Sequence, residues 1–106
     1  MATTEDFIRF VCDQIADTGE VRYRKMFGEY MVYVNDRPLL LVCENTVYIK
    51  KVAAVESLLA EAPKGTPYTG AKEHHILDIE DVPLCRDVVA ALLPVTPIPV
   101  KKKKKT

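Results

Sequence analysis

The stretch from residue 21 to residue 50 constrains the fold most, because β-branched and aromatic residues alternate there with turn residues at short intervals. This pattern predicts four strands, near residues 21–27, 30–34, 38–43 and 46–50. Asn35-Asp36 separates the second predicted strand from the third, and Glu44-Asn45 separates the third from the fourth. Turns this short join neighbouring antiparallel strands, so the stretch predicts a β-meander.

The third predicted strand contains Leu39, Leu40, Leu41 and Val42 in succession. A strand that is apolar on both sides needs cover on both faces, which predicts a central position and helices packed on the sheet. Three segments supply such helices. They begin after Thr3 or Thr4 as N-cap, at Val52, and at Leu84 after Pro83.

The first of these helices should place Phe7, Ile8, Val11, Cys12 and Ile15 on one stripe and should end at Thr18-Gly19. The second should run over 52–62 and the third over 84–93. Residues 63–72 form a loop, and residues 74–79 form one more short strand. The predicted fold class is therefore α+β: an antiparallel β-meander of about four strands plus one short strand, packed by three helices.

The 106 residues suit one domain, predicted over 1–94 and followed by a disordered Pro- and Lys-rich tail over 95–106. The apolar runs are far shorter than the roughly 20 residues of a membrane-spanning helix. The start, MATTEDF, lacks the features of a signal peptide, so a cytoplasmic location is expected. Cys12, Cys43 and Cys85 are widely spaced and have apolar neighbours, which predicts reduced thiols in or near the core.

Charge is unevenly distributed along a chain whose formal net charge is zero. Five of the 15 basic residues are Lys101 to Lys105, so the rest of the chain has 10 basic and 15 acidic residues, a net of −5. The stretch from Val21 to Lys51 is the exception, with six basic and three acidic residues. Positive charge is therefore local, because a body with a net negative charge binds phosphate backbones poorly.

The sequence contains no recognisable catalytic or metal-binding motif. The four glycines are isolated, and the only serine, Ser57, lies inside a predicted helix. Glu80-Asp81 directly precedes the third helix, which favours an N-capping role over acid-base chemistry. His74 and His75 should point to opposite faces of a strand and so cannot easily share one ion. We therefore expect no catalytic residue, no metal ligand and no cofactor.

The segment YRKMFGEYMVY, residues 23 to 33, mixes basic and aromatic residues on both faces of the predicted strands. Gly28 suits a turn or a bulge at this point. The segment is compatible with ordinary sheet packing beneath extended Arg and Lys side chains, and also with a recognition surface. Residue types alone leave both interpretations open.

The same residues resemble the N-terminal domain of the TfoX/Sxy family, whose pattern centres on Arg-Lys/Arg-Met-Phe-Gly and two later Tyr-bearing strands. The matching positions here are Arg24 to Gly28, then Val32-Tyr33, then Val47-Tyr48-Ile49-Lys50. The resemblance extends from about residue 5 to residue 94, although many family patterns have a second glycine where this sequence has Glu29. It implies a small α+β domain of regulators of bacterial natural competence. Such regulators act through protein contacts with the transcription machinery, including the cyclic-AMP receptor protein, and no catalysis is expected of them.

Three functional hypotheses follow. The first is a non-enzymatic regulatory or adaptor domain in its single-domain form, which binds a protein partner and does not bind a membrane. Its predicted interaction surface comprises Arg22, Arg24, Lys25, Met26, Phe27, Gly28, Glu29, Tyr30 and Tyr33. The alternative is a direct nucleic-acid-binding protein that uses Arg22, Arg24, Lys25 and the lysine tail. The third is a small-molecule or enzyme role at a cleft near Tyr68, His74 and His75.

The third helix is more apolar than one sheet face would hide, because apolar residues cover most of its circumference. Apolar surface that the monomer leaves exposed usually marks an interface. We therefore predict a two-fold dimer whose contact includes Val89 and Leu93.

Overall fold

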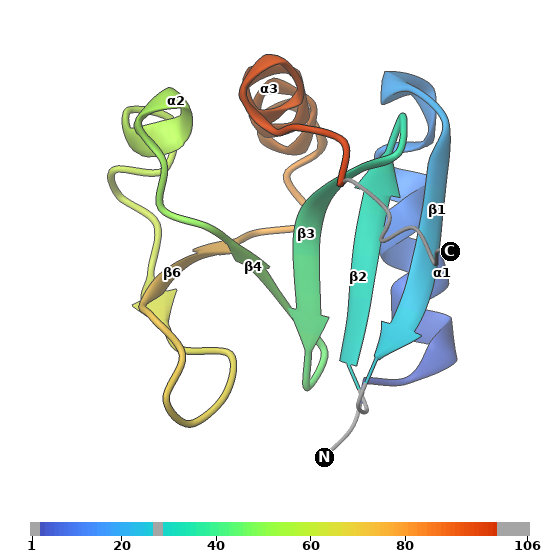
Figure 1. The fold of residues 1–106 in the computed structure, drawn as a ribbon, viewed down its shortest axis with the longest axis horizontal. Coiled ribbons are helices and arrows are strands. Elements are labelled where there is room, and N and C mark those ends of the chain that lie inside the picture. The colour runs from blue at the N-terminus through green and yellow to red at the C-terminus, as the bar shows by residue number, and fades with distance from the viewer. Residues whose placement is uncertain (1–2, 27–28, 100–106) are drawn as a thin grey trace, which may run out of the picture.

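The computed structural model describes residues 3–26 and 29–99, and these residues form an α+β fold, as predicted (Figure 1). Its elements are α1 (Glu5–Gln14), the 3-10 turn η1 (Ala16–Thr18), β1 (Val21–Met26), β2 (Glu29–Val34), β3 (Arg37–Cys43), β4 (Thr46–Ile49), α2 (Ala53–Glu56), β5 (Lys64–Gly65), β6 (His74–Leu77), α3 (Val82–Leu92) and the 3-10 turn η2 (Leu93–Val95). The described strands make one six-stranded antiparallel sheet in the order β1-β2-β3-β4-β6-β5. Gly28 and Phe27 lie outside the described residues, so the predicted turn or bulge at Gly28 stays a prediction.

Two tight turns build the meander as the sequence predicts. Asn35 and Asp36 have φ angles of 52° and 68°, and Glu44 and Asn45 have φ angles of 52° and 57°. Positive φ at both central residues matches the right-handed twist of the flanking strands, and asparagine and aspartate tolerate it better than most residues. These turns set the register in which β2 pairs with β3 and β3 pairs with β4.

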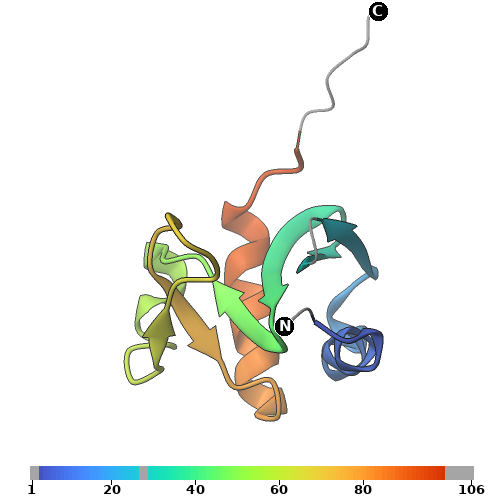
Figure 2. The same ribbon diagram turned by 90° about the horizontal axis from the view of Figure 1, so that it is seen from below.

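The core lies between one face of the sheet and the helices. On this core face β2, β3 and β4 contribute alternate buried residues, and α1, α2 and α3 pack against them. The core includes Ile8, Val11, Ile15, Val32, Val34, Leu40, Val42, Val47, Ile49, Val55, Leu77, Val88 and Leu92. Figures 1 and 2 both show α3 between α1 and α2. The predicted stripe of α1 is confirmed, with Ile8, Val11 and Ile15 fully buried.

The helix ends follow local capping chemistry. The Thr4 hydroxyl accepts a hydrogen bond from the Phe7 backbone N–H (3.2 Å), and a carboxylate oxygen of Asp81 accepts one from the Leu84 N–H (3.2 Å). Each side chain satisfies one of the free N–H groups of a first helical turn. The predicted N-capping role of the Glu80-Asp81 pair is therefore confirmed for Asp81.

The structure corrects three details of the predicted elements. Helix α2 ends at Glu56, and the chain continues to Ala62 in turns, with the Ala62 N–H bonded to the Leu59 carbonyl (3.1 Å). The predicted helix over 52–62 is therefore shortened by six residues at its C-terminal end, and Pro63 accounts for the non-helical conformation of Ala62 alone. The two-residue strand β5 was not predicted, because Lys64-Gly65 has no strand signature of its own.

The third correction concerns cover for β3. The strand is central, as predicted, but Leu41 is only half-buried, and the helices pack on the opposite face. Val32 pairs with Leu40 and Tyr33 pairs with Pro38, so Leu39 is an extra residue in β3. Such a bulge bends a strand and re-aims its side chains. The bulge accounts for the burial of both Leu39 and Leu40.

After α3 the chain continues beyond the end of the helix and passes the start of β3 (Figure 2). The Arg37 guanidinium donates a hydrogen bond to the Thr96 carbonyl (2.8 Å), which holds this segment near the start of β3. The proposed boundary at residue 94 stays a prediction, as does the disordered tail, whose residues 100–106 lie outside the described part of the chain. Within that described part, no helix is both long and apolar enough to cross a bilayer.

Candidate functional site

The face of the sheet opposite the core carries a row of side chains that crosses five strands. Arg24 of β1 pairs with Met31 of β2, Met31 with Leu41 of β3, Leu41 with Tyr48 of β4, and Tyr48 with Ile76 of β6. Partners in register point to the same face. We call this face the open face and these five residues the open-face row. Four of them are half-buried, and Arg24 is exposed.

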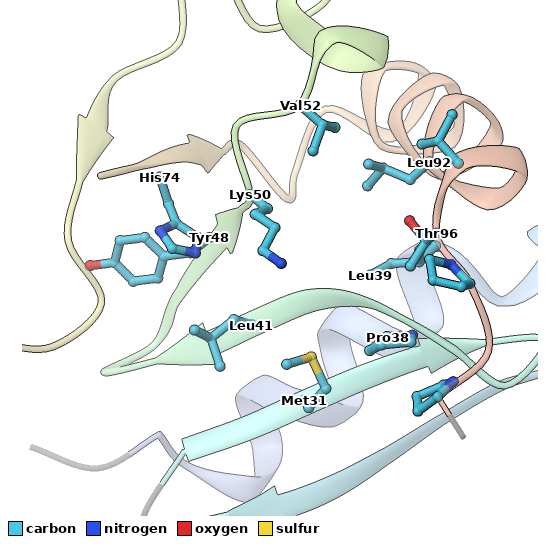
Figure 3. A pocket seen from close by; sticks show the side chains of 13 residues that line it. Met31, Pro38, Leu39, Leu41, Tyr48, Lys50, Val52, His74, Leu92 and Thr96 are labelled. Atoms are coloured by element: carbon cyan, nitrogen blue, oxygen red, sulfur yellow. The ribbon is translucent and has the colours of Figure 1, made fainter. Parts of the chain in front are cut away.

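A groove of about 440 Å³ lies over the middle of the open-face row (Figure 3). Its walls come from β2, β3 and β4 on one side and from the segment after α3 on the other. The lining residues used below are Met31, Leu39, Leu41, Tyr48, Lys50, Val52, His74 and Thr96. Volumes of this order are typical of ligand-binding clefts. The groove is therefore large enough to take one or two side chains of a partner.

The groove is mostly apolar and contains one cation. Figure 3 shows the Lys50 side chain, which follows the last residue of β4, extending into the space on the Leu41 side of the groove. No acidic side chain lines the groove, and among the described residues none forms an ion pair with Lys50. An ammonium group next to apolar walls attracts an anion more strongly than it would in open water.

Tyr48 and His74 form the polar end of the groove. Their rings meet edge to face, with centroids 6.3 Å apart, and His74 Nδ1 lies 2.7 Å from the Lys72 carbonyl oxygen. A carbonyl can only accept, so His74 carries its proton on Nδ1 and leaves Nε2 available to the groove. Burial raises the pKa of the Tyr48 hydroxyl, which therefore remains a hydrogen-bond donor.

The predicted interaction surface is divided between the two faces of the sheet. Arg22, Arg24 and Tyr33 belong to the open face, where the Arg22 guanidinium lies 4.5 Å from the centre of the Tyr33 ring. Arg22 also pairs with Asp36 at 3.2 Å. Both contacts hold the guanidinium over the ring, as expected for cation–π packing.

Other members of that predicted surface lie elsewhere. Tyr30 is buried on the core face, in edge contact with Tyr23 at a centroid distance of 5.4 Å. Lys25 pairs with Tyr30 in register, so it belongs to the strand positions that face away from the open face, although its side chain is exposed. Glu29, by contrast, shares the strand face of Met31 and Tyr33 and so belongs to the open face, where its carboxylate accepts a hydrogen bond from the Cys43 thiol (3.4 Å). Met26 pairs with Glu29 through the backbone, and Phe27 and Gly28 are outside the described residues.

The three cysteines pack in or against the core as free thiols. Cys43 donates to the Pro67 carbonyl (3.1 Å) and to a Glu29 carboxylate oxygen (3.4 Å). Burial raises the pKa of the Cys12, Cys43 and Cys85 thiols to about 11. All three are free, and the prediction of core or near-core thiols is confirmed.

The adjacent histidines separate as the alternation predicts. His74 lines the groove, whereas His75 is 3% exposed on the core side of β6. Within residues 3–26 and 29–99, no three His, Cys, Asp or Glu side chains converge as a metal site would require. Tyr68 is 55% exposed and does not line the groove, so the predicted cleft of Tyr68, His74 and His75 is not assembled as a unit.

The proposed dimer residues lie on α3. Val89 is fully buried in the monomer's own core, and Leu93 packs partly against that core. A two-fold dimer stays a prediction, and Val89 could contribute to its contact only if the monomer's core opened.

The open-face residues Leu41, Tyr48, Lys50 and Ile76 were not predicted as a site. A signal was present, because Thr46, Tyr48 and Lys50 alternate with the buried Val47 and Ile49. Combining that alternation with the two short turns would have placed Leu41 opposite Tyr48. The pairing with β6 has no comparable local signal.

Comparison with known proteins agrees with this fold. The family model described as the TfoX N-terminal domain matches residues 13–83. A protein of Spirochaeta aurantia, described as an uncharacterized 12.7 kDa protein in the trpE 5′ region, is 32% identical over 108 residues, which cover 100% of this chain and 94% of the relative. The match covers well over half of the chain and includes all four strands of the meander. The chain therefore belongs to the TfoX N-terminal domain family.

Proposed function

We propose that this protein is a non-enzymatic regulatory or adaptor domain that acts by binding a protein partner through the open face of its sheet. The observation that supports this proposal is the open-face row. Half-buried Met31, Leu41, Tyr48 and Ile76 form a continuous apolar strip on a face that the helices leave uncovered. Contiguous apolar surface flanked by charged residues is typical of protein interfaces.

The resemblance to TfoX/Sxy regulators gives this proposal a biological setting. Members of that family act in natural competence through contacts with the transcription machinery, and a role in transcriptional regulation is the corresponding proposal here. The arrangement of the open face favours binding over catalysis. Its polar groups, Lys50, Tyr48 and His74, can orient and attract a ligand. Burial raises the pKa of Cys43, which follows Leu41 by two residues on β3, so that this thiol stays protonated.

Site-specific photo-crosslinking in native cells tests the adaptor role. A photoreactive phenylalanine analogue at the half-buried Tyr48, which lines the groove, would report on the open face, and the same analogue at the exposed Tyr68 would be the control. We expect one protein to be captured from position 48 and not from position 68. Equal capture from both positions, or no captured protein at position 48, would contradict the proposal.

Direct nucleic-acid binding is the second candidate. Arg24 and Lys25 are exposed and form no ion pair within the described residues, and Arg22 shares the open face with Arg24. Three phosphate contacts would give a slope of log K against log salt of about −2.7 on duplex DNA, and contacts from the lysine tail would steepen it. A measured slope near zero would exclude this candidate.

A further inference from the structure

The charge of the groove restricts what can occupy it. Its lining contains the cation Lys50 and no acidic side chain, and Arg24 at the β1 end of the open-face row also has no acidic partner within the described residues. Apolar walls with one unpaired cation best accommodate a ligand that is apolar along its length and carries an anion at a defined point.

We propose that the open face binds an acidic, apolar peptide segment of a protein partner, which lies along the open-face row with a side chain in the groove and a carboxylate on Lys50. This inference rests on the proposed adaptor function and adds the chemistry of the partner. The apolar side chain contacts Leu41, Met31 and Val52, and the carboxylate pairs with the Lys50 ammonium group (Figure 3).

The length of the row fits a short extended segment. Strands in a sheet are about 4.8 Å apart, so the five strands of the row span roughly 19 Å. An extended peptide rises about 3.3 Å per residue, so six residues cover this distance. Lys50 follows Tyr48 on the same side of β4, which places it about 16 Å from Arg24, or about five peptide residues away. Two acidic residues with this spacing would engage both cations.

Other occupants fit this surface less well. The tail residues Lys101 to Lys105 have the same sign of charge as Lys50 and Arg24, so the chain's own tail is repelled. A two-fold copy that used the same face would bring like charges together. A nucleic-acid backbone would satisfy the cations but would leave Leu41 and Met31 against a polar chain.

Selection of peptides by the full chain tests the proposal. Random heptapeptides displayed on phage are selected against the wild-type protein and, in parallel, against Lys50→Glu and Lys25→Glu. Both variants make the same change of charge on exposed side chains, but Lys25 belongs to the other strand face. We expect the wild type and Lys25→Glu to enrich peptides that combine Asp or Glu with Leu, Ile or Phe, and Lys50→Glu to lose this enrichment.

Fluorescence anisotropy with the enriched peptide then measures the effect. At 0.15 M salt, where charges beyond about 8 Å are screened, Lys50→Glu should weaken binding by about tenfold and Lys25→Glu by less than about twofold. Met31→Gln should also weaken binding. Addition of the peptide to the wild-type protein should change amide and methyl NMR chemical shifts most at Leu41 and Tyr48. This measurement does not depend on whether a variant folds.

Several results would each overturn the proposal. The first is a set of selected peptides with no enrichment of acidic residues, the second is binding of the peptide by Lys50→Glu as tight as by the wild type, and the third is NMR shift changes confined to another surface. Tighter binding of duplex DNA than of peptide, or a doubled mass in light scattering with the open face buried in the dimer, would also overturn it. Failure here differs from failure of the adaptor role. If a partner crosslinks at position 48 while no acidic peptide is selected, the adaptor role stands and the proposed peptide chemistry is wrong. If the peptide binds but no protein crosslinks, the groove stands and the adaptor role falls.

Discussion

His75 is buried on the core side of β6, and neither of its ring nitrogens has a hydrogen-bond partner among the described residues. A buried polar group without a partner costs about 1 to 3 kcal/mol of stability. Leucine is apolar and of similar size, so His75→Leu should raise the free energy of unfolding by about 1 to 2 kcal/mol at pH 8. For a domain of this size that corresponds to an increase in Tm of roughly 4 to 16 °C.

Lower pH should enlarge the difference in stability between His75→Leu and the wild type. Burial, followed by the positive charges of Lys64 and Lys51, lowers the pKa of His75 from its usual 6.5, while Glu56 and Glu73 oppose the shift. Below pH 6.5 the unfolded chain binds a proton at this position that the folded chain does not, so stability falls as the pH falls. The loss is at most about 1.4 kcal/mol per pH unit, until the pH reaches the lowered pKa of the folded state.

Thermal unfolding followed by circular dichroism at pH 8.0, 7.0, 6.0 and 5.5 measures both effects. The wild type should lose stability between pH 7 and 5.5, and His75→Leu should lose much less over the same range. His74→Leu is the matched control, because His74 is the other histidine of the chain and lies on the open face. A lower Tm for His75→Leu at pH 8, or parallel pH profiles for it and the wild type, would refute the reasoning.

Three further predictions concern packing, capping and thiol reactivity. A Cβ atom at Gly19 would lie 2.9 Å from Val34 Cγ1, so Gly19→Ala should destabilise the fold by about 1 to 3 kcal/mol. Urea unfolding measures this loss, and an unchanged urea midpoint would show that the neighbouring side chains move aside freely. Asp81→Ala should cost about 1 kcal/mol through the lost N-cap, whereas Glu80→Ala should change stability little, and equal effects would contradict the capping assignment. Cys43 should react with Ellman's reagent at pH 8 only as fast as the protein unfolds, and rapid labelling of the native state would show that its thiol is accessible.

Local chemistry made much of the fold predictable. The Asn35-Asp36 and Glu44-Asn45 turns depend on which residues tolerate positive φ, and the stripe of Ile8, Val11 and Ile15 depends only on helical periodicity. The helix over 52–62 is predicted too long, because the apolar spacing continues through Leu58 and Ala62, which pack against the core from turns rather than from a helix.

The candidate site was only partly predictable, because a local pattern does not say which face of a strand is buried. Alternation along β1 correctly separates Arg22 and Arg24 from Tyr23 and Lys25, but it does not say which set faces the helices. That choice depends on burial across the whole sheet. The sequence alone therefore suggested the basic and aromatic composition of a surface, and Tyr30 was included in it although it packs in the core.

The sequence by itself determined the meander, the caps and the alternation of apolar residues, because these depend on neighbours a few residues apart. Only the tertiary structure decided that β6 pairs with β4 and that Ile76 extends the open-face row beyond Tyr48. It also decided that the segment around Thr96 forms one wall of the groove. These contacts join residues far apart in the chain. Such contacts are selected by the packing of the whole core and by the cost of closing long loops, and no local pattern encodes either.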